Sequence, residues 1–179
     1  RDGEVLGGAD RPVGNACPAE PDGLYYVAFP DCHAVAAVRA DTGVVQASIR
    51  FAADGTATLG DGELSCPREC GDRDPIVDGA RPTSLDLVRD ERVGTQKLAI
   101  GVANRPVVTV VTLAATGLPA TVAQVDLDGD VGVTDVALSA QITMGGKNGI
   151  NDGDPGTDAQ FVYAVASDST VRVAEVLVA

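Results

Sequence analysis

The stretch that most constrains the fold is Leu24–Phe51, in which three short apolar runs alternate with turn residues. The runs are Leu24–Phe29, Ala34–Arg39 and Val44–Phe51, and the breaks between them read Pro-Asp-Cys-His and Asp-Thr-Gly. Aromatic and β-branched runs of this length, bounded by Gly, Pro and Asp, are typical of consecutive strands in an antiparallel meander. The stretch therefore predicts three strands in a row.

The same pattern recurs at Lys97–Gly117 and Gln160–Ala179. Each copy has an apolar run, a short polar loop and a second run that is rich in Val. The first two copies close with Thr-Gly, at Thr42-Gly43 and Thr116-Gly117. A recurring unit that is too small to bury its own apolar face indicates a repeat architecture.

The first copy resembles the YVTN family of β-propeller repeats, in which a strand beginning Leu-Tyr-Val is followed by a loop, a Val-rich strand and a Thr-Gly turn. The match rests on Leu24-Tyr25-Tyr26-Val27, Val35–Val38 and Asp41-Thr42-Gly43. It covers three patches, well under half of the chain. The resemblance implies four-stranded antiparallel blades. It does not imply a function, because propellers host many unrelated activities.

The rest of the chain adds more strands and no clear helix. Further strands are expected at Thr56–Leu59, Thr83–Val88, Leu98–Ala103, Val107–Leu113, Ala120–Leu127, Phe161–Ala166 and Val171–Val178. The best helix candidate, Val136–Met144, also reads as a strand, and no segment keeps helical apolar spacing over three turns. We predict an all-β chain of antiparallel four-stranded blades, an incomplete β-propeller of two to three blades. A self-contained β-sandwich is the alternative.

The domain organisation follows from the same pattern. Residues 1–23 are expected to form an irregular arm, and residues 24–179 a propeller-like domain with long loops at 52–82 and 145–159. A propeller closes with four to eight blades, so two to three blades would leave sheet edges open. The chain also begins at Arg1 without a visible signal peptide, which suggests a processed or cut terminus. We therefore expect one segment of a larger molecule, completed by another chain, by the remainder of the same precursor or by a second copy.

Composition and residue pattern argue against two functions, nucleic-acid binding and membrane spanning. The net charge is −13 and the only lysines are Lys97 and Lys147, whereas nucleic-acid binding requires clustered cations. The longest uncharged stretch, Pro106–Val125, contains Gly117, Pro119 and many β-branched residues. It is therefore predicted to form two strands and a turn, not a membrane span.

The four cysteines, Cys17, Cys32, Cys66 and Cys70, favour two disulfides and an oxidising compartment, hence a secreted or cell-surface protein. The alternatives are a zinc site and free thiols. A zinc knuckle usually has two residues between its cysteines, whereas three residues separate Cys66 from Cys70 and fourteen separate Cys17 from Cys32. We expect the local pairing, Cys66 with Cys70 and Cys17 with Cys32.

The sharpest candidate site is acidic: Asp126, Asp128, Asp130 and Asp135 are closely spaced around Gly129. Alternating carboxylates can hold calcium, as in EF-hand loops, and the stretch looks like the calcium loops of integrin-type propeller repeats. An EF-hand register starting at Gln124 puts Asp126, Asp128 and Asp135 at ligand positions and Gly129 at the glycine position. Gln124 itself and an Asp in place of the final Glu depart from that pattern. The alternative is a solvated Asp-Gly turn.

A second acidic stretch, residues 151–158, has oxygen donors without regular spacing and is read as a solvated loop.

Catalysis has little support in the sequence. The only histidine, His33, follows Cys32, and adjacent residues of a strand point to opposite faces, so a Cys-His dyad is not expected. The predicted function is therefore a non-enzymatic structural or interaction module of bacterial type, secreted or on the cell surface. A metal-dependent hydrolase or lactonase-like propeller and a calcium-stabilised adhesin are the alternatives.

Overall fold

The computed structural model of the protein describes residues 23–62, 64, 79–90, 94–144 and 157–176. The described chain is all-β, with one short 3-10 helix, η2 (Pro30–Cys32), which confirms the predicted class. The strands are β1 (Leu24–Phe29), β2 (Ala34–Arg39), β3 (Val45–Phe51), β4 (Ala57–Gly60), β5 (Pro82–Asp90), β6 (Thr95–Val102), β7 (Val107–Leu113), β8 (Pro119–Asp126), β9 (Val133–Leu138), β10 (Ile142–Met144), β11 (Thr157–Ala166) and β12 (Val171–Val176).

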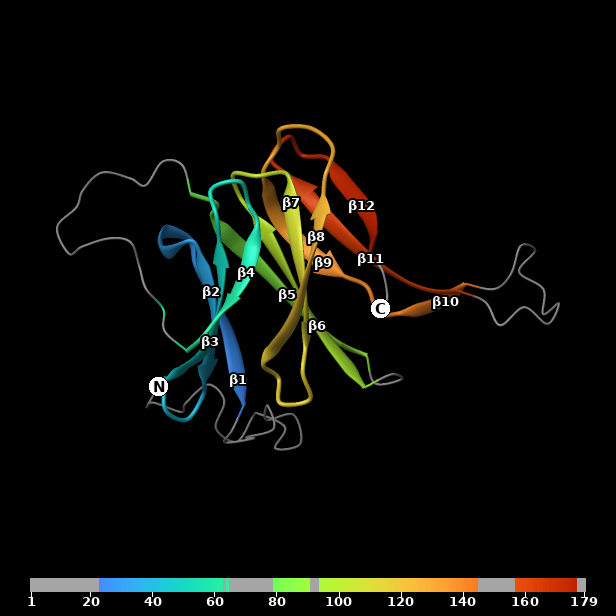
Figure 1. The fold of residues 1–179 in the computed structure, drawn as a ribbon. Helices are drawn as coiled ribbons and strands as arrows, with labels where there is room; N and C mark the ends of the chain where they lie inside the picture. The colour runs from blue at the N-terminus through green and yellow to red at the C-terminus, as the bar shows by residue number, and fades with distance from the viewer. Residues whose placement is uncertain (1–22, 63, 65–78, 91–93, 145–156, 177–179) are drawn as a thin grey trace, which may run out of the picture.

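The strands form three antiparallel sheets, here called A, B and C (Figure 1). Sheet A runs β1-β2-β3-β4 and sheet B runs β5-β6-β7-β8, so each strand pairs with its neighbour in sequence. In sheet C, β9 and β10 pair with β11, and β12 pairs with β11 on its other side. Meanders of this kind follow from short strands joined by tight turns.

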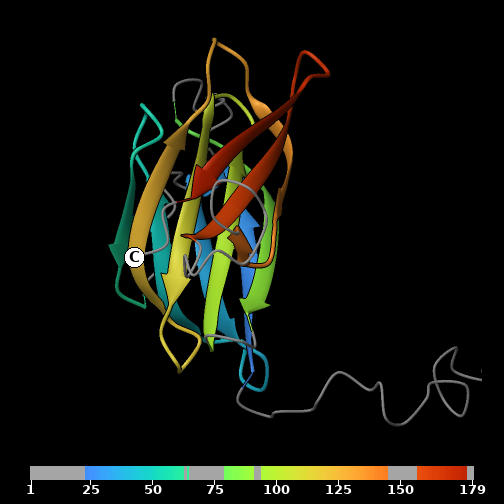
Figure 2. The same cartoon turned by 90° about the vertical axis from the view of Figure 1, so that its right-hand side faces the viewer.

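The sheets stack face to face, with sheet B in the middle (Figure 1). Strand β1 lies against β5, β4 lies against β8, and β9 lies against β5 and β6. The first strands of the three sheets are therefore neighbours. In Figure 2 the outer face of sheet C is toward the viewer, and its strands are tilted relative to those of sheet B behind it.

The core has two parts because sheet B buries both of its faces. Between sheets A and B lie Val35, Ile49, Phe51, Ala80, Leu98, Ile100, Val102, Val111 and Leu113. Between sheets B and C lie Ala99, Val108, Val110, Leu127, Val133, Val136, Leu138, Val162, Ala164 and Val176. Successive residues of β6 and β7 alternate between the two clusters. That alternation explains why Leu98–Val102 of β6 and most of β7 are apolar on both faces.

Sheets B and C approach closely at two glycines. A Cβ on Gly101 of β6 would lie 2.7 Å from Cγ1 of Val133, which is fully buried on β9. A Cβ on Gly132, just before β9, would overlap the backbone carbonyl of Ala103. Glycine in a strand often marks such a close approach of a neighbouring backbone. These two positions therefore set how tightly sheet C sits on sheet B.

Side chains bridge the point where β9 ends. The Asp86 carboxylate, on β5 of sheet B, accepts a hydrogen bond from the backbone N–H of Leu138 at 2.7 Å. The next residue, Ser139, donates its N–H to the carbonyl of Phe161 at 2.8 Å, and its hydroxyl accepts the Phe161 N–H at 2.9 Å. The interruption between β9 and β10 is thus hydrogen-bonded on both sides, and Asp86 ties it to the neighbouring sheet.

Several predicted boundaries are corrected. The strand expected at Thr56–Leu59, inside the long loop 52–82, is β4, shifted by one residue, and β11 begins inside the predicted loop 145–159. Strand β5 continues to Asp90 and β6 begins at Thr95, so both extend beyond the bounds Thr83–Val88 and Leu98–Ala103 that the sequence predicts. The helix candidate Val136–Met144 is strand on both sides of Ser139–Gln141. Residues 1–22 of the predicted arm lie outside the described residues.

Within the described part of the chain, no helix is long and apolar enough to cross a membrane.

Candidate functional site

The outer face of sheet C is apolar and exposed. On β11 Tyr163 is 43% exposed and Val165 is 38% exposed, and on β12 Val171 and Val173 are 64% and 55% exposed. Tyr163 lies directly opposite Val173, and Val165 opposite Val171, so the four side chains share one face. Exposed β-branched and aromatic side chains in one contiguous group are typical of an interaction surface.

Two carboxylates accompany this apolar group. Asp135 of β9 lies opposite Val165, and Glu175 of β12 lies opposite Phe161, so both belong to the outer face of sheet C. Both residues are exposed. The face is therefore apolar at its centre and negatively charged toward its margins.

The outer face of sheet A is apolar along β1. Tyr25 is 62% exposed and Val27 is 39% exposed, and both are on this face, opposite Val38 and Ala36 of β2. Ala36 and Ser48, at the middle of the face, are fully buried, so its exposed apolar part is the β1 margin.

The described charged residue on this face of sheet A is Arg50 of β3, which lies opposite Ala34 and Thr58 and is exposed. Arg50 borders a hollow of about 570 Å³, which Thr58, Leu59, Gly60 and Asp61 also line. The outer face of sheet A is thus apolar along β1, and on its other side both Arg50 and Asp61 border a hollow.

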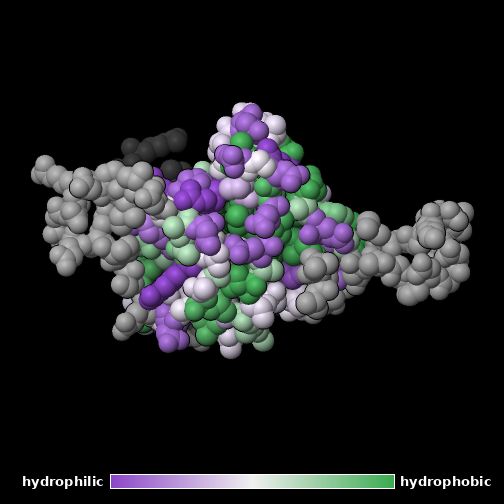
Figure 3. Space-filling view, turned by 45° about the horizontal axis from the view of Figure 1, so that its top comes forward, coloured by the Kyte–Doolittle hydropathy of each residue, from purple (hydrophilic) through white to green (hydrophobic). Residues whose placement is uncertain are grey.

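The ends of the stack differ from these faces. Figure 3 shows the molecule with the end that carries the turn 127–132 brought forward, and hydrophilic residues there are interspersed with small apolar groups. The predicted acidic site lies at this end. Asp126 ends β8, Asp128 and Asp130 are in the turn, Asp135 is on β9, and all are exposed.

The structure does not gather these acids into a metal site. Among the described residues, no three His, Cys, Asp or Glu side chains are grouped so that they could hold a metal ion. Arg172 of β12 shares a hollow with Asp126 and Asp128, and a Cβ on Gly129 would lie 3.5 Å from its guanidinium nitrogens. A fixed cation beside the loop opposes the binding of a second cation. Calcium binding by Asp126, Asp128, Asp130 and Asp135 stays a hypothesis. The alternative interpretation is still a solvated Asp-Gly turn.

Cys32 takes part in a disulfide. Cys17, Cys66 and Cys70 lie outside the described residues, so the predicted pairing is still a prediction. Cys32 ends η2, and His33 follows it in the left-handed conformation, with φ of 52°.

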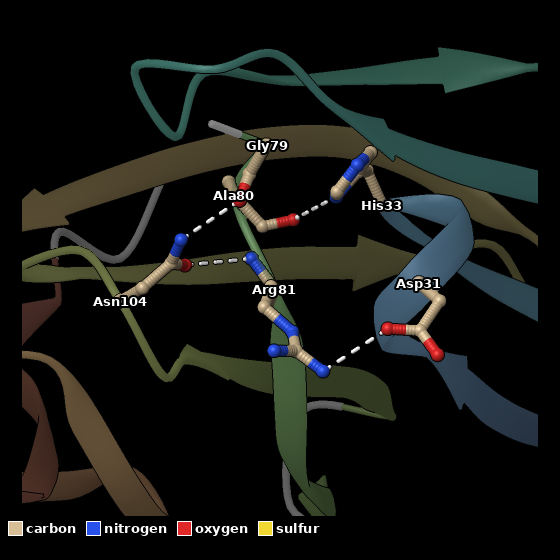
Figure 4. A network of polar contacts seen from close by, with 6 residues as sticks. All are labelled: Asp31, His33, Gly79, Ala80, Arg81 and Asn104. Carbon is tan, nitrogen blue, oxygen red and sulfur yellow. Dashed lines mark hydrogen bonds and ion pairs between the residues drawn. The ribbon is translucent and has the colours of Figure 1, made fainter. Parts of the chain in front are cut away.

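His33 and Asn104 hold the segment that leads into β5 (Figure 4). The Nδ1 atom of His33 lies 2.9 Å from the carbonyl oxygen of Ala80, and the ring sits directly over Gly79, where a Cβ would overlap it. The side-chain oxygen of Asn104 accepts the N–H of Arg81 at 2.8 Å, and its amide nitrogen donates to the carbonyl of Gly79 at 2.8 Å. The imidazole therefore joins sheet A to the start of sheet B, which is a structural role.

An ion pair adds to the same junction. The Arg81 guanidinium lies 3.0 Å from the carboxylate of Asp31 in η2, with both side chains at least half exposed (Figure 4). Next to it, Arg105 donates to the carbonyl of Ala53 at 2.7 Å, and Gln124 donates to the carbonyl of Gly55 at 2.8 Å. The β3–β4 turn is thus hydrogen-bonded to sheet B.

The described carboxylates with lowered pKa values belong to turns. The Arg39 side chain lowers the pKa of Asp41, the backbone N–H of Thr56 lowers that of Asp54, and the Thr170 hydroxyl lowers that of Asp168. All three carboxyl groups are exposed, and each is stabilised by its own turn. Burial raises the pKa of Tyr26, whose hydroxyl donates to the carbonyl of Gly117 in the β7–β8 turn. These shifts describe turn and packing contacts.

Sequence reasoning missed the outer faces, although a signal for them exists. Leu24–Phe29 and Gln160–Ala166 are apolar at almost every position. Continuous apolar strands are typical of sheets that are covered on both sides, whereas a sheet with one face in water alternates apolar and polar residues.

Comparison with known proteins gives no relative: no family model, no curated protein and no solved structure matches this chain.

Proposed function

We propose that this chain is a non-enzymatic structural or interaction module, secreted or on the cell surface, and that it is one segment of a larger β-propeller protein or assembly. The observation that carries the proposal is that both outer faces of the three-sheet stack, those of sheets A and C, present exposed apolar side chains. Tyr25 and Val27 are on the outer face of sheet A, and Tyr163, Val171 and Val173 are on that of sheet C. A polypeptide that covered these faces would bury surface that is unfavourable to leave in water.

The internal arrangement supports the propeller part of the proposal. Sheets A and B are four-stranded meanders, and the first strands of all three sheets are neighbours. Radially arranged blades have the same meander, and each blade packs its faces on two neighbours. The YVTN-like residues lie on β1, on β2 and in the turn between β2 and β3 of sheet A. In this proposal the three sheets are blades, and only sheet B has both of its neighbours.

The non-enzymatic part rests on what the chemically versatile side chains do here. His33 packs on backbone and bridges sheets A and B, and Cys32 takes part in a disulfide. The rival, a metal-dependent hydrolase or lactonase-like propeller, would need ligands from several sheets around a central ion. The disulfide of Cys32 supports an oxidising compartment, and with it a secreted or cell-surface location.

The test is the native mass and composition of the particle that contains this chain, purified without denaturant and compared with the same sample after denaturation. The proposal predicts that the particle holds more than one copy of the 18.1 kDa chain or a further polypeptide. A stable particle of one chain alone would contradict it.

A further inference from the structure

We propose that the free edge of β12 binds one extended strand of a further polypeptide, which becomes the fourth strand of sheet C. This strand would pair antiparallel with β12, as β4 pairs with β3 in sheet A and β8 with β7 in sheet B. The inference rests on the proposed function, because it states what the completing polypeptide supplies to this chain.

Sheet C is one strand narrower than the other two sheets. Sheets A and B each have four strands side by side. In sheet C, β9 and β10 pair with successive parts of β11, so three of the described strands lie side by side at any level. Among the described residues, no strand pairs with the other edge of β12. The place that β4 and β8 fill in sheets A and B is therefore open in sheet C.

The hydrogen bonds of β11 show which groups of β12 are already paired. Phe161 of β11 bonds to Ser139, on the β9 side, through both its N–H and its carbonyl group. Successive residues of a strand direct these groups to alternate sides, so the neighbours of Phe161 along β11 direct theirs toward β12. The residues of β12 that lie opposite those neighbours are Arg172, Ala174 and Val176.

The other residues of β12 leave backbone groups at the free edge. By the same alternation, the N–H and carbonyl groups of Val171, Val173 and Glu175 point away from β11. A row of unpaired N–H and carbonyl groups is a template for an added strand, which gains main-chain hydrogen bonds when it binds. The chemistry of the edge therefore identifies its ligand as an extended polypeptide.

Sheet B offers support beneath the added strand. Ala123 of β8 lies opposite Val110, which is buried against sheet C, yet Ala123 is exposed. On its other side β8 lies against β4, and Val122 packs against the core between sheets A and B. A hollow of about 430 Å³ is lined by residues 126–128, at the end of β8, and by residues 172–174 of β12. A fourth strand in sheet C would lie along this hollow and cover β8 as β4 does from the other side.

The sequence and the packing point to a polypeptide other than this chain. The segments of this chain outside the described residues are rich in Gly, Pro and charged residues, and none contains an apolar run of strand length. A second copy paired through its own β12 fits poorly. The inner face of β12 packs on sheet B, so the sheet B of that copy would meet β8 of the first.

The surroundings of the edge specify the side chains of the added strand. On the outer face they would lie beside Val171 and Val173, which are 64% and 55% exposed and favour β-branched or aromatic neighbours. Glu175 is exposed on the same face and favours a cationic neighbour. On the inner face they would lie over Ala123. We therefore expect an apolar strand with a Lys or Arg toward one end.

Hydrogen exchange at single-residue resolution tests the proposal, in the native particle and in the full chain alone. The amides of Val171, Val173 and Glu175 should exchange at least about tenfold more slowly in the native particle than in the chain alone. The amides of Arg172 and Ala174 are bonded to β11, so they should be protected in both samples and serve as the internal reference.

Val173→Pro gives a second test, because it removes an N–H that points to the free edge and none that β11 uses. It should weaken reassembly with the further polypeptide of the native particle about tenfold or more. Val173→Thr is the matched control, since it keeps both the N–H and a β-branched side chain, and it should weaken reassembly much less. Protection of the Arg172 amide establishes that each variant is folded; if Val173→Pro does not fold, exchange in the unmodified chain decides.

Other results would overturn the inference in distinguishable ways. Protection of the outward amides in the chain alone would assign the edge to a segment of this same chain, and protection that appears only as the pure chain dimerises would assign it to a second copy. If the native particle holds a further polypeptide but the outward amides exchange as in the chain alone, the inference fails and the proposed function stands. A native particle that consists of one chain alone overturns both.

Discussion

Gly101→Ala should destabilise the protein, although alanine in a strand is usually more stabilising than glycine. Gly101 lies in β6 on the side of sheet B that faces sheet C, and its φ is not in the left-handed region. Replacing glycine by alanine in an unstrained strand stabilises by about 0.5–1 kcal/mol, because the unfolded chain loses freedom. The measured effect therefore reports whether Ser84 of the neighbouring strand and Val133 of sheet C leave room for one methyl group, and the Val133 variant below separates the two.

The geometry indicates that it does not. The new Cβ would lie 2.7 Å from Cγ1 of Val133 and closer still to the hydroxyl of Ser84. Carbon atoms at optimal separation are about 3.5–4.0 Å apart, so sheets B and C would have to separate by about 1 Å or force Val133 off its rotamer. Overpacking of this kind costs about 1–3 kcal/mol. A loss of about 2 kcal/mol would lower Tm by about 4–8 °C in a chain of this size.

The assay is urea unfolding followed by circular dichroism, together with thermal melting. Val133→Ala serves as the matched variant because it removes the methyl group that Gly101→Ala would meet. In the double variant the two changes should compensate, with a favourable coupling of about 1 kcal/mol or more. If Gly101→Ala is neutral or stabilising, the crowding described around Gly101 is wrong, and if the double variant shows no coupling, sheet C does not pack on sheet B as described.

Three further outcomes follow from other contacts. Asn104→Ala leaves the Arg81 N–H and the Gly79 carbonyl without their partner, so it should lower the free energy of unfolding in urea by about 1–3 kcal/mol. Asp31→Ala removes an exposed ion pair and should lower it by less than about 1 kcal/mol. Equal costs would refute the assigned roles. Because burial raises the folded-state pKa of Tyr26, the unfolded state loses the phenol proton first as the pH rises. The contribution of Tyr26 to the free energy of unfolding should therefore be fully present below about pH 10 and decrease above it. Tyr26→Phe should remove the part of this pH dependence that Tyr26 contributes. A slope that Tyr26→Phe leaves unchanged would contradict the burial of its hydroxyl. Calcium should not raise Tm, because Arg172 flanks the Asp126–Asp130 turn; a calcium-dependent rise that Asp128→Asn abolishes would restore the calcium hypothesis.

Much of the fold was predictable because its signals are local. The apolar runs of Leu24–Phe51 and Val107–Leu113 give strands at the expected places, and the Thr-Gly turns at Gly43 and Gly117 have the positive φ values, 68° and 79°, that favour glycine. The division of the last strands was not predictable. Where the chain passes from β9 to β10, the side chains of Asp86 and Ser139 bond the backbone N–H groups of Leu138 and Phe161. In both hydrogen bonds the two residues are distant in sequence, so the sequence pattern does not reveal them.

The candidate sites were harder to predict from the sequence. The spacing of Asp126, Asp128 and Asp130 suggests a common centre, but the turn leaves all three exposed with Arg172 alongside, which only the packing of β12 reveals. The role of His33 likewise depends on Gly79, a residue distant in sequence that the fold brings under its ring. The outer faces required knowledge of which sheet lies in the middle, since apolar strands alone do not tell a covered face from an uncovered one.

The central claim is that both outer faces are covered in the native particle, and hydroxyl-radical footprinting of the three tyrosines tests it most directly. Tyr26, which donates its hydroxyl to the turn at Gly117, is an internal reference for protection. Tyr25 and Tyr163 are 62% and 43% exposed in the single chain. The account predicts that both are protected nearly as well as Tyr26 in the native particle and become reactive when it is dissociated. If Tyr25 and Tyr163 are oxidised in the native particle as fast as in the dissociated chain, the faces are open to water and the account is wrong.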